Sequence, residues 1–167
     1  MSRIRIDKGY VPGSLGRAVE LHGAYYGAHW GFGLFFEAKV ATDLAEFLKR
    51  CDESRDGFWT ASADGRVEGC IAIDGIHAET GGAHLRWFIM SDAQRGKGTG
   101  GQLLERAVGF CQDRGYPRIY LWTFEGLETA RHLYEKHGFR LVAEQRGSRW
   151  GSVVNEQRFE RVLAALA

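Results

Sequence analysis

The sequence predicts a single domain of the α/β (α+β) class over residues 1–167, with a mixed central sheet of about seven strands and about four helices. Its 167 residues match the usual length of one domain. With 44% hydrophobic and 26% charged residues, the chain can bury a full core without disulfides. Stretches of alternating hydrophobicity, typical of strands, are interspersed with stretches of helical periodicity along the chain.

The N-terminal part is predicted to form one short strand and two helices. Ile4 and Ile6 alternate with polar residues, which indicates a half-buried strand. Hydrophobic residues then recur at helical spacing over residues 15–26 and again over 36–48. Ser14 stands where a side chain can cap the first helix.

An antiparallel hairpin is predicted next. The strand-like runs 58–62 and 67–74 flank Asp64-Gly65, a dipeptide that favours a tight hairpin turn because both positions accept positive φ.

A βαβ unit follows. The strand-like run 84–90 leads into a loop and the glycine cluster GKGTGG at 96–101, an amphipathic stripe over 103–111 indicates a helix, and the apolar run 119–124 suits a buried, parallel strand. Residues 127–134 then form a fourth helical stripe, and a closing hairpin follows.

Charge and cysteine content exclude several classes of protein. The formal net charge of +1 favours neither nucleic acid nor a membrane surface. The three cysteines are widely spaced without a C-x-x-C motif, so neither a disulfide framework nor a thiolate metal site is indicated. The N-terminus lacks the apolar run of a signal peptide. We therefore expect a cytoplasmic protein that uses no metal and contacts neither nucleic acid nor membrane.

The glycine cluster is suited to binding an anion. It opens a helix, where free backbone N–H groups and the helix dipole favour negative charge, and missing Cβ atoms let phosphate oxygens approach closely. A Walker A loop is excluded because Gly98 follows Gly96-Lys97 where Ser or Thr is needed. A dinucleotide fingerprint is formally matched, but no array of parallel βα units surrounds it.

A third pattern, [Arg or Gln]-x-x-Gly-x-[Gly or Ala], is present at Arg95, Gly98 and Gly100. Together with LYEKHGF at 133–139, it makes the chain resemble the GCN5-related N-acetyltransferase (GNAT) superfamily over its whole length. In amino-acid sequence, AHLRWFIM and LWTFEGLETARHLYEKHGF are similar to the acetyltransferase portion often fused behind a MarR-type DNA-binding domain. The chain carries no such DNA-binding half, so regulation by DNA binding is not implied.

The resemblance implies acetyl-coenzyme A as donor of an acetyl group to a primary amine of a small molecule or peptide. The cofactor's pyrophosphate would lie on the glycine cluster and its pantetheine arm beside the preceding strand, with Phe88 and Trp122 on the two strands that separate. An Asn often found in the family three residues before the helix alanine is Leu127 here. The implied cofactor-binding residues are Phe88, Ile89, Met90, Arg95, Gly96, Lys97, Gly98, Thr99, Gly100 and Gly101.

The resemblance also assigns catalytic roles. Tyr134 stands where the family places its general acid, and a tyrosine is protonated at neutral pH and able to give its proton to a departing thiolate. For the base, His84 is our first candidate, since an ordinary histidine pKa suits proton acceptance near pH 7. Strand alternation would place it on one face with Arg86 and Phe88. Glu79, Glu125 and solvent water are the alternatives.

The acceptor amine is expected beside the aromatic residues around the turn between the first two helices. As substrate-binding residues we single out Tyr26, Trp30 and Phe35. The same aromatics could instead pack the helices onto the sheet or form a homodimer surface. Two other functions stay open: a non-catalytic acyl-coenzyme A sensor and, less favoured, an NAD-dependent oxidoreductase.

Overall fold

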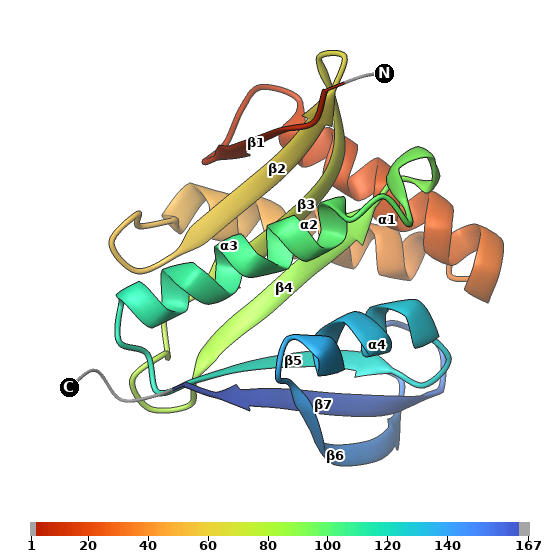
Figure 1. Ribbon diagram of the computed structural model, residues 1–167. Helices are drawn as coiled ribbons and strands as arrows, with labels where there is room; N and C mark the ends of the chain where they lie inside the picture. Colours follow the sequence, from red (N-terminus) through yellow and green to blue (C-terminus); the bar gives the residue numbers. More distant parts are fainter. Residues whose placement is uncertain (1–2, 164–167) are drawn as a thin grey trace.

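Seven strands form one mixed sheet in the order β1-β2-β3-β4-β5-β7-β6 in the computed structural model, which describes residues 3–163 (Figure 1). Four α-helices and one short 3-10 helix accompany them within these residues, confirming the predicted fold class. The strands are β1 (Arg5–Lys8), β2 (Gly57–Ala63), β3 (Arg66–Asp74), β4 (Ala83–Met90), β5 (Arg118–Phe124), β6 (Arg140–Gly147) and β7 (Val154–Val162). The helices are α1 (Ser14–Trp30), α2 (Leu34–Arg50), η1 (Asp92–Gln94), α3 (Thr99–Asp113) and α4 (Glu128–Lys136).

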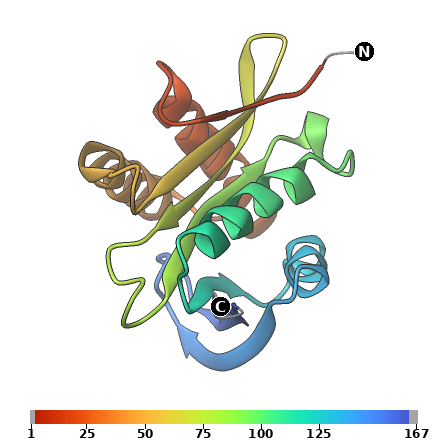
Figure 2. The ribbon, with the colours of Figure 1, turned by 60° about the vertical axis from the view of Figure 1, so that its left-hand side comes forward.

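The helices cover both faces of the sheet. In Figure 1 α3 and α4 lie in front of the strands and α1 and α2 behind them, and the turned view in Figure 2 shows the same separation. The larger core lies under α3, where Leu103, Leu104 and Ala107 pack against the sheet. A second core joins α1 and α2 to the opposite face around Leu44 and Phe47.

Local sequence explains the turns. Asp64 and Gly65 adopt φ values of 51° and 76°, as the predicted hairpin turn requires. Gly138 ends the segment after α4 with a φ of 86°. The expected cap at Ser14 was wrong: α1 is preceded by left-handed Gly13, no side chain caps it, and the Ser14 hydroxyl instead accepts a hydrogen bond from the N–H of Val11 at 3.3 Å.

The parallel strands β4 and β5 separate soon after they meet. Their ladder in the described part of the chain consists of two pairs, Ala83 with Ile119 and His84 with Tyr120. Beyond these pairs β5 stays bonded to β7 along its whole length, whereas β4 stays with β3. The side of β4 that faces β5 therefore has backbone groups available for another extended chain.

A β-bulge in β4 changes which face its side chains occupy. Trp87 has a φ of 49°, and the β3–β4 register shifts between Cys70 and Ala72. His84 and Arg86 consequently lie on the α1–α2 face, while Phe88 packs in the core under α3. The expectation that Phe88 shares a face with His84 and Arg86 was wrong, because the extra residue reverses the alternation after Arg86.

Candidate active site

A cavity of about 400 Å³ occupies the gap between β4 and β5, and we call it the central cavity. Residues from both faces of the sheet line it, so it passes between the two helical layers. Tyr26 and Asp43 reach it from α1 and α2, Tyr134 from α4, and Arg149 from the β6–β7 loop. The other lining residues are His22, Phe36, Lys39, Val40, His84, Leu85, Arg86, Trp87, Phe88, Leu121, Trp122, Thr123, Phe124, Leu127 and Trp150.

The glycine loop, residues 95–101, leads from β4 into α3. Gly96 and Gly98 have φ values of 76° and 84°, and a Cβ built on either meets no atom within 4 Å. Gly98 precedes α3, whose first turn receives no side-chain cap. Left-handed glycines, open space and uncapped N–H groups at a helix start together suit an anionic group such as a diphosphate.

The remaining members of the loop differ in their surroundings. Lys97 is exposed, and Arg95 pairs with Asp92 at 3.0 Å while its guanidinium lies 4.0 Å from the Tyr25 ring centre. Thr99 is buried. Gly101 lies close to the side chains of Leu133 and His137.

Gly100 faces the core rather than open space. A Cβ there would lie 3.4 Å from Phe88 and 3.6 Å from both Leu133 and Met90. A single Cβ would make ordinary van der Waals contact there, whereas a longer side chain would meet residues of β4 and α4. A charged substitution at Gly100 would disturb packing as well as any ligand, which makes Gly100 a poor test of phosphate binding.

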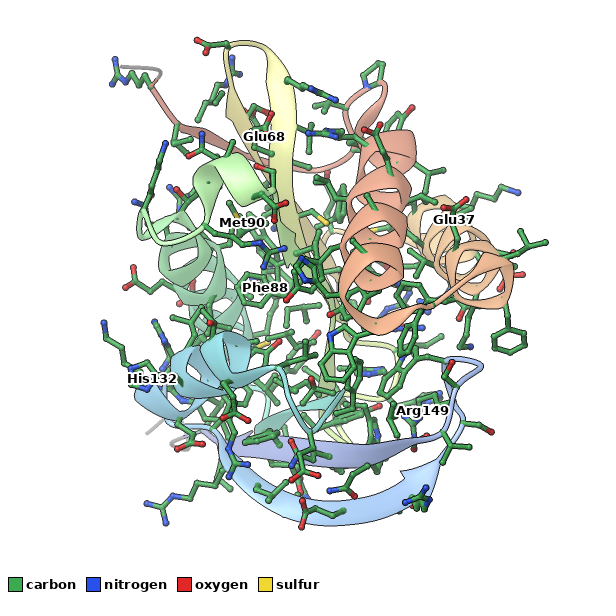
Figure 3. The ribbon with its side chains drawn as sticks, turned by 90° about the vertical axis from the view of Figure 1, so that its right-hand side faces the viewer. Glu37, Glu68, Phe88, Met90, His132 and Arg149 are labelled. Carbon is green, nitrogen blue, oxygen red and sulfur yellow. The ribbon has the colours of Figure 1, made fainter. Side chains whose placement is uncertain are left out.

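The β4 residues named for cofactor binding surround the bulge. Phe88 lines the central cavity and lies 6.0 Å, ring centre to ring centre, from Tyr134. Ile89 packs in the α1–α2 core and Met90 in the core under α3. Figure 3 shows Phe88 and Met90 in the middle of the molecule, between α1 and α3. Ile89 and Met90 can therefore meet a ligand through their backbone only.

Tyr134 is buried at the α4 side of the central cavity. Its ring packs against Phe139 and Phe159 at centre distances of 6.0 and 6.1 Å. Burial raises the pKa of Tyr134 above its ordinary value, so the hydroxyl stays protonated throughout the neutral range. No hydrogen bond to this hydroxyl is found among residues 3–163.

His84 lines the central cavity, but its pKa differs from expectation. Its ring stacks on Tyr120 at 4.4 Å between centres. Burial, followed by the positive charge of Arg86, lowers the pKa of His84 to about 3. The imidazole is therefore neutral at pH 7 and keeps one nitrogen lone pair. The alternatives Glu79 and Glu125 are exposed and do not line the cavity.

A second neutral histidine, His22, escaped the sequence analysis. Its Nδ1 lies 2.7 Å from the Ala18 carbonyl, which can only accept, so Nδ1 carries the proton and Nε2 keeps its lone pair. Burial lowers the pKa of His22 to about 4. No sequence motif distinguishes His22 from a core residue, because it lies on the apolar stripe of α1.

The predicted acceptor aromatics divide into lining and supporting residues. Tyr26 lines the central cavity. Trp30 lies outside it, with its ring 4.8 Å from that of Phe124 in an edge-on arrangement. Phe35 is 62% exposed beside Gly151 of the β6–β7 loop. Of the three, only Tyr26 is placed to touch a ligand in the cavity.

Charged lining residues were missed by the sequence analysis. Arg149, labelled in Figure 3, and Trp150 belong to the β6–β7 loop, where they lie against Trp122 and Phe124 of β5. Lys39 and Asp43 form an i,i+4 pair on α2 at 3.0 Å. Such pairs are ordinary on solvent-facing helices, so nothing in the local sequence indicates a site.

Within residues 3–163, no three His, Cys, Asp or Glu side chains are grouped to share a metal ion. The helices of the same residues are too short or too polar to cross a bilayer.

Fold and site together define an α/β domain in which two separating parallel strands leave a cavity and the first of these strands leads into a glycine-rich loop at a helix start. The model of the acetyltransferase (GNAT) family matches residues 18–139. The chain thus belongs to the GNAT family of acyltransferases.

Known relatives agree with this placement. The chain is 31% identical over 107 residues to N-acetyltransferase 8 of Mus musculus, covering 62% of this chain and 47% of that protein. It therefore spans about half the length of the curated relatives it matches. Among solved structures, yncA from Salmonella typhimurium, a putative acetyltransferase with its cofactor acetyl-CoA, superposes with a TM-score of 0.76 at 16% identity over 98% of this chain and 96% of that one. An acetyltransferase from Streptococcus agalactiae gives 0.74 at 22% identity, covering 96% and 98%.

Proposed function

We propose that the protein transfers an acetyl group from acetyl-coenzyme A to a primary amine of a small molecule or peptide, with Tyr134 as general acid. The observation that carries this proposal is the central cavity itself. It opens where β4 loses β5 as a partner, it is lined by β4 residues of the strand that leads into the glycine loop, and it has a protonated, buried tyrosine at its wall.

The residues on the cofactor side fit coenzyme A. First-turn N–H groups of α3, with Lys97 nearby, would receive the pyrophosphate. The unpaired side of β4 would bond the amides of the pantetheine arm as a strand does. A backbone N–H near Phe88 or Ile89 would then be available to the thioester oxygen as negative charge develops on it. Family membership and the acetyl-CoA complex of yncA support this assignment.

Tyr134 supplies the proton that the leaving group needs. As the amine nitrogen forms its bond to the acetyl carbon and the carbon–sulfur bond breaks, the sulfur takes the electron pair and the hydroxyl proton of Tyr134. The amine's surplus proton passes to water, or through water back to the tyrosine. Because Tyr134 is surrounded by aromatic rings and held protonated, it can donate at any neutral pH.

His84 is proposed to orient the amine or the water that receives the amine's proton. Its neutral imidazole can accept a hydrogen bond at neutral pH. A pKa of about 3 makes it a weak base, so it serves better in orienting a water or the amine than in holding the proton.

Two alternative functions can be separated from this one by ligand binding. A thermal-shift panel of acetyl-coenzyme A, NAD and ATP, followed by an amine acetylation assay, separates them, because ligand at 100 times its Kd stabilises by about 2.7 kcal/mol. For a domain of this size that is roughly 5 to 10 °C. We expect a shift with acetyl-coenzyme A alone. A shift with NAD alone would indicate the oxidoreductase, and a shift with acetyl-coenzyme A but no amine acetylation would indicate the sensor.

The finer likeness to acetyltransferase portions of MarR-type fusions, a cytoplasmic location and the absence of a metal remain predictions. The acceptor side of the central cavity gives more direct information about the substrate.

A further inference from the structure

We infer that the acceptor amine carries an anionic group, such as a carboxylate, and that Arg86 and Arg149 bind this group. The inference rests on the proposed function and names the class of its substrate. Three cations, Lys39, Arg86 and Arg149, line the central cavity, whereas Asp43 is the one carboxylate among its lining residues in the described part of the chain.

Arg86 has hydrogen-bonding capacity that the protein does not use. Its guanidinium lies 3.8 Å from the Asp43 carboxylate and 3.5 Å from that of Asp74, and within residues 3–163 its side chain makes no hydrogen bond. Each carboxylate has a closer cation, Lys39 at 3.0 Å and Arg50 at 2.6 Å. A half-buried guanidinium whose neighbours are bonded elsewhere is suited to a ligand anion.

Arg149 approaches the same space from the β6–β7 loop. Its guanidinium lies 4.0 Å from the Trp122 ring centre, and this contact holds the guanidinium in place. Its ion pair with Glu156 is made through Nε at 3.4 Å, while Glu156 also accepts hydrogen bonds from Gln145 and from the Arg149 backbone. Within residues 3–163, Glu156 thus has two hydrogen-bond donors besides the guanidinium, and the charge of Arg149 also helps to hold the pKa of this buried carboxyl group low.

Arg86, Arg149 and His84 all line the central cavity. The positive charges of both arginines, and that of Arg158, lower the pKa of His84, whereas Asp74 raises it. Such a site disfavours an acceptor whose only charge is its ammonium group, because three cations and one carboxylate among the described residues line the cavity. An acceptor with an acid group is attracted instead, and the cationic surroundings lower the pKa of its ammonium, which helps to form the neutral nucleophile.

The remaining wall indicates what else the acceptor contains. Tyr26, Phe36 and Trp150 present aromatic surface to the central cavity. An apolar or aromatic side group between the amine and this wall would be buried. Amino acids with such side chains carry the amine, the acid and the apolar group in one molecule, so they serve as probes.

The test measures binding and needs no turnover. N-acetylphenylalanine and N-acetylphenethylamine, which differ only in the carboxylate, are titrated by calorimetry into the full chain with coenzyme A present. N-acetyltryptophan and N-acetyltryptamine form a second pair. We expect the acid of each pair to bind at least about tenfold more tightly, the effect of one charge-assisted hydrogen bond.

Three variants locate the effect. Arg86→Gln and Arg149→Gln should each remove most of the preference for the acid. Because Arg149 pairs with buried Glu156 of β7, circular dichroism and thermal unfolding are used to show that the Arg149 variant is folded. Arg158→Gln is the matched control, because Arg158 stacks on Tyr120 at 4.1 Å beside His84 but does not line the cavity. It should keep the preference. Equal affinity within each pair, no binding of either acid, or the same loss in all three variants would overturn the inference.

Failure of the anionic subsite and failure of the proposed function give different results. Acetylation of phenylalanine and phenethylamine at equal rates, with equal binding of their products, would refute the anionic subsite and leave the acetyltransferase in place. Arginine-dependent binding of the acids, with no amine acetylated, would refute the acetyltransferase and retain the subsite.

Discussion

Removing one oxygen from Tyr134 separates catalysis from packing. Tyr134→Phe keeps the ring that contacts Phe88, Phe139 and Phe159 and deletes the hydroxyl proposed to protonate the departing thiolate. Since that hydroxyl has no hydrogen-bond partner among the described residues, we expect the free energy of unfolding to change by less than about 1 kcal/mol. Affinity for acetyl-coenzyme A should be nearly unchanged, because the glycine loop is untouched.

The effect on turnover should be much larger. General-acid catalysis contributes about 10² to 10⁴ in rate, or roughly 3 to 5 kcal/mol of barrier. Water entering the cavity would recover part of this, so we expect kcat to fall by at least tenfold. The assay follows release of coenzyme A thiol at saturating donor, with a pre-steady-state measurement to show that product release does not limit the rate.

Tyr116→Phe is the matched control. The Tyr116 hydroxyl donates a 2.7 Å hydrogen bond to the Arg55 carbonyl, away from the central cavity. This variant should lose about 1 kcal/mol of stability and keep its kcat, the reverse of Tyr134→Phe. Equal kcat for the parent and Tyr134→Phe would refute the general-acid role and leave Tyr134 as a packing residue.

Three further predictions concern the glycine loop and the buried histidines. Lys97→Glu should weaken acetyl-coenzyme A binding about tenfold by calorimetry, and the equally exposed Lys49→Glu should not; equal effects would point to a general charge effect. His84→Ala should lower kcat without changing the shape of the pH profile between pH 5 and 8, because a group with a pKa of about 3 stays neutral there; loss of an inflection near pH 6.5 would show a higher pKa. The free energy of unfolding should fall as pH drops below about 6.5, because His22 and His84 take up protons in the unfolded chain but not in the folded one. Each histidine should lower it by about 2 kcal/mol by pH 5. Equal free energies of urea unfolding at pH 7.5 and pH 5 would contradict their burial as neutral groups.

Elements with strong local signals were predictable from sequence. Asp64-Gly65 permits a turn that few other dipeptides adopt, and the glycines at 96 and 98 supply the left-handed backbone before α3. Tyr134 was found because its spacing from Gly138 and Phe139 matches a family pattern, and the structure places it on the cavity wall. In each case the feature depends on residues that are close together in the sequence.

Features that depend on distant contacts were not predictable. The bulge at Trp87 follows from how β4 pairs with β3, and it moved Phe88 to the opposite face from His84. The pKa of His84 depends on burial and on arginines from β4, β7 and the β6–β7 loop. Arg149 enters the site only because the closing hairpin folds back over β5, and no local pattern records that.

The central claim is acetyl transfer from acetyl-coenzyme A to an amine, and a single mass-spectrometric assay tests it most directly. The full chain is incubated with acetyl-coenzyme A and a panel of primary amines that includes phenylalanine, and both free coenzyme A and the amines are quantified. The account predicts that at least one amine gains the mass of one acetyl group in equal molar amount to the coenzyme A released. Release of coenzyme A that is the same with and without amine, or no release at all, would contradict it.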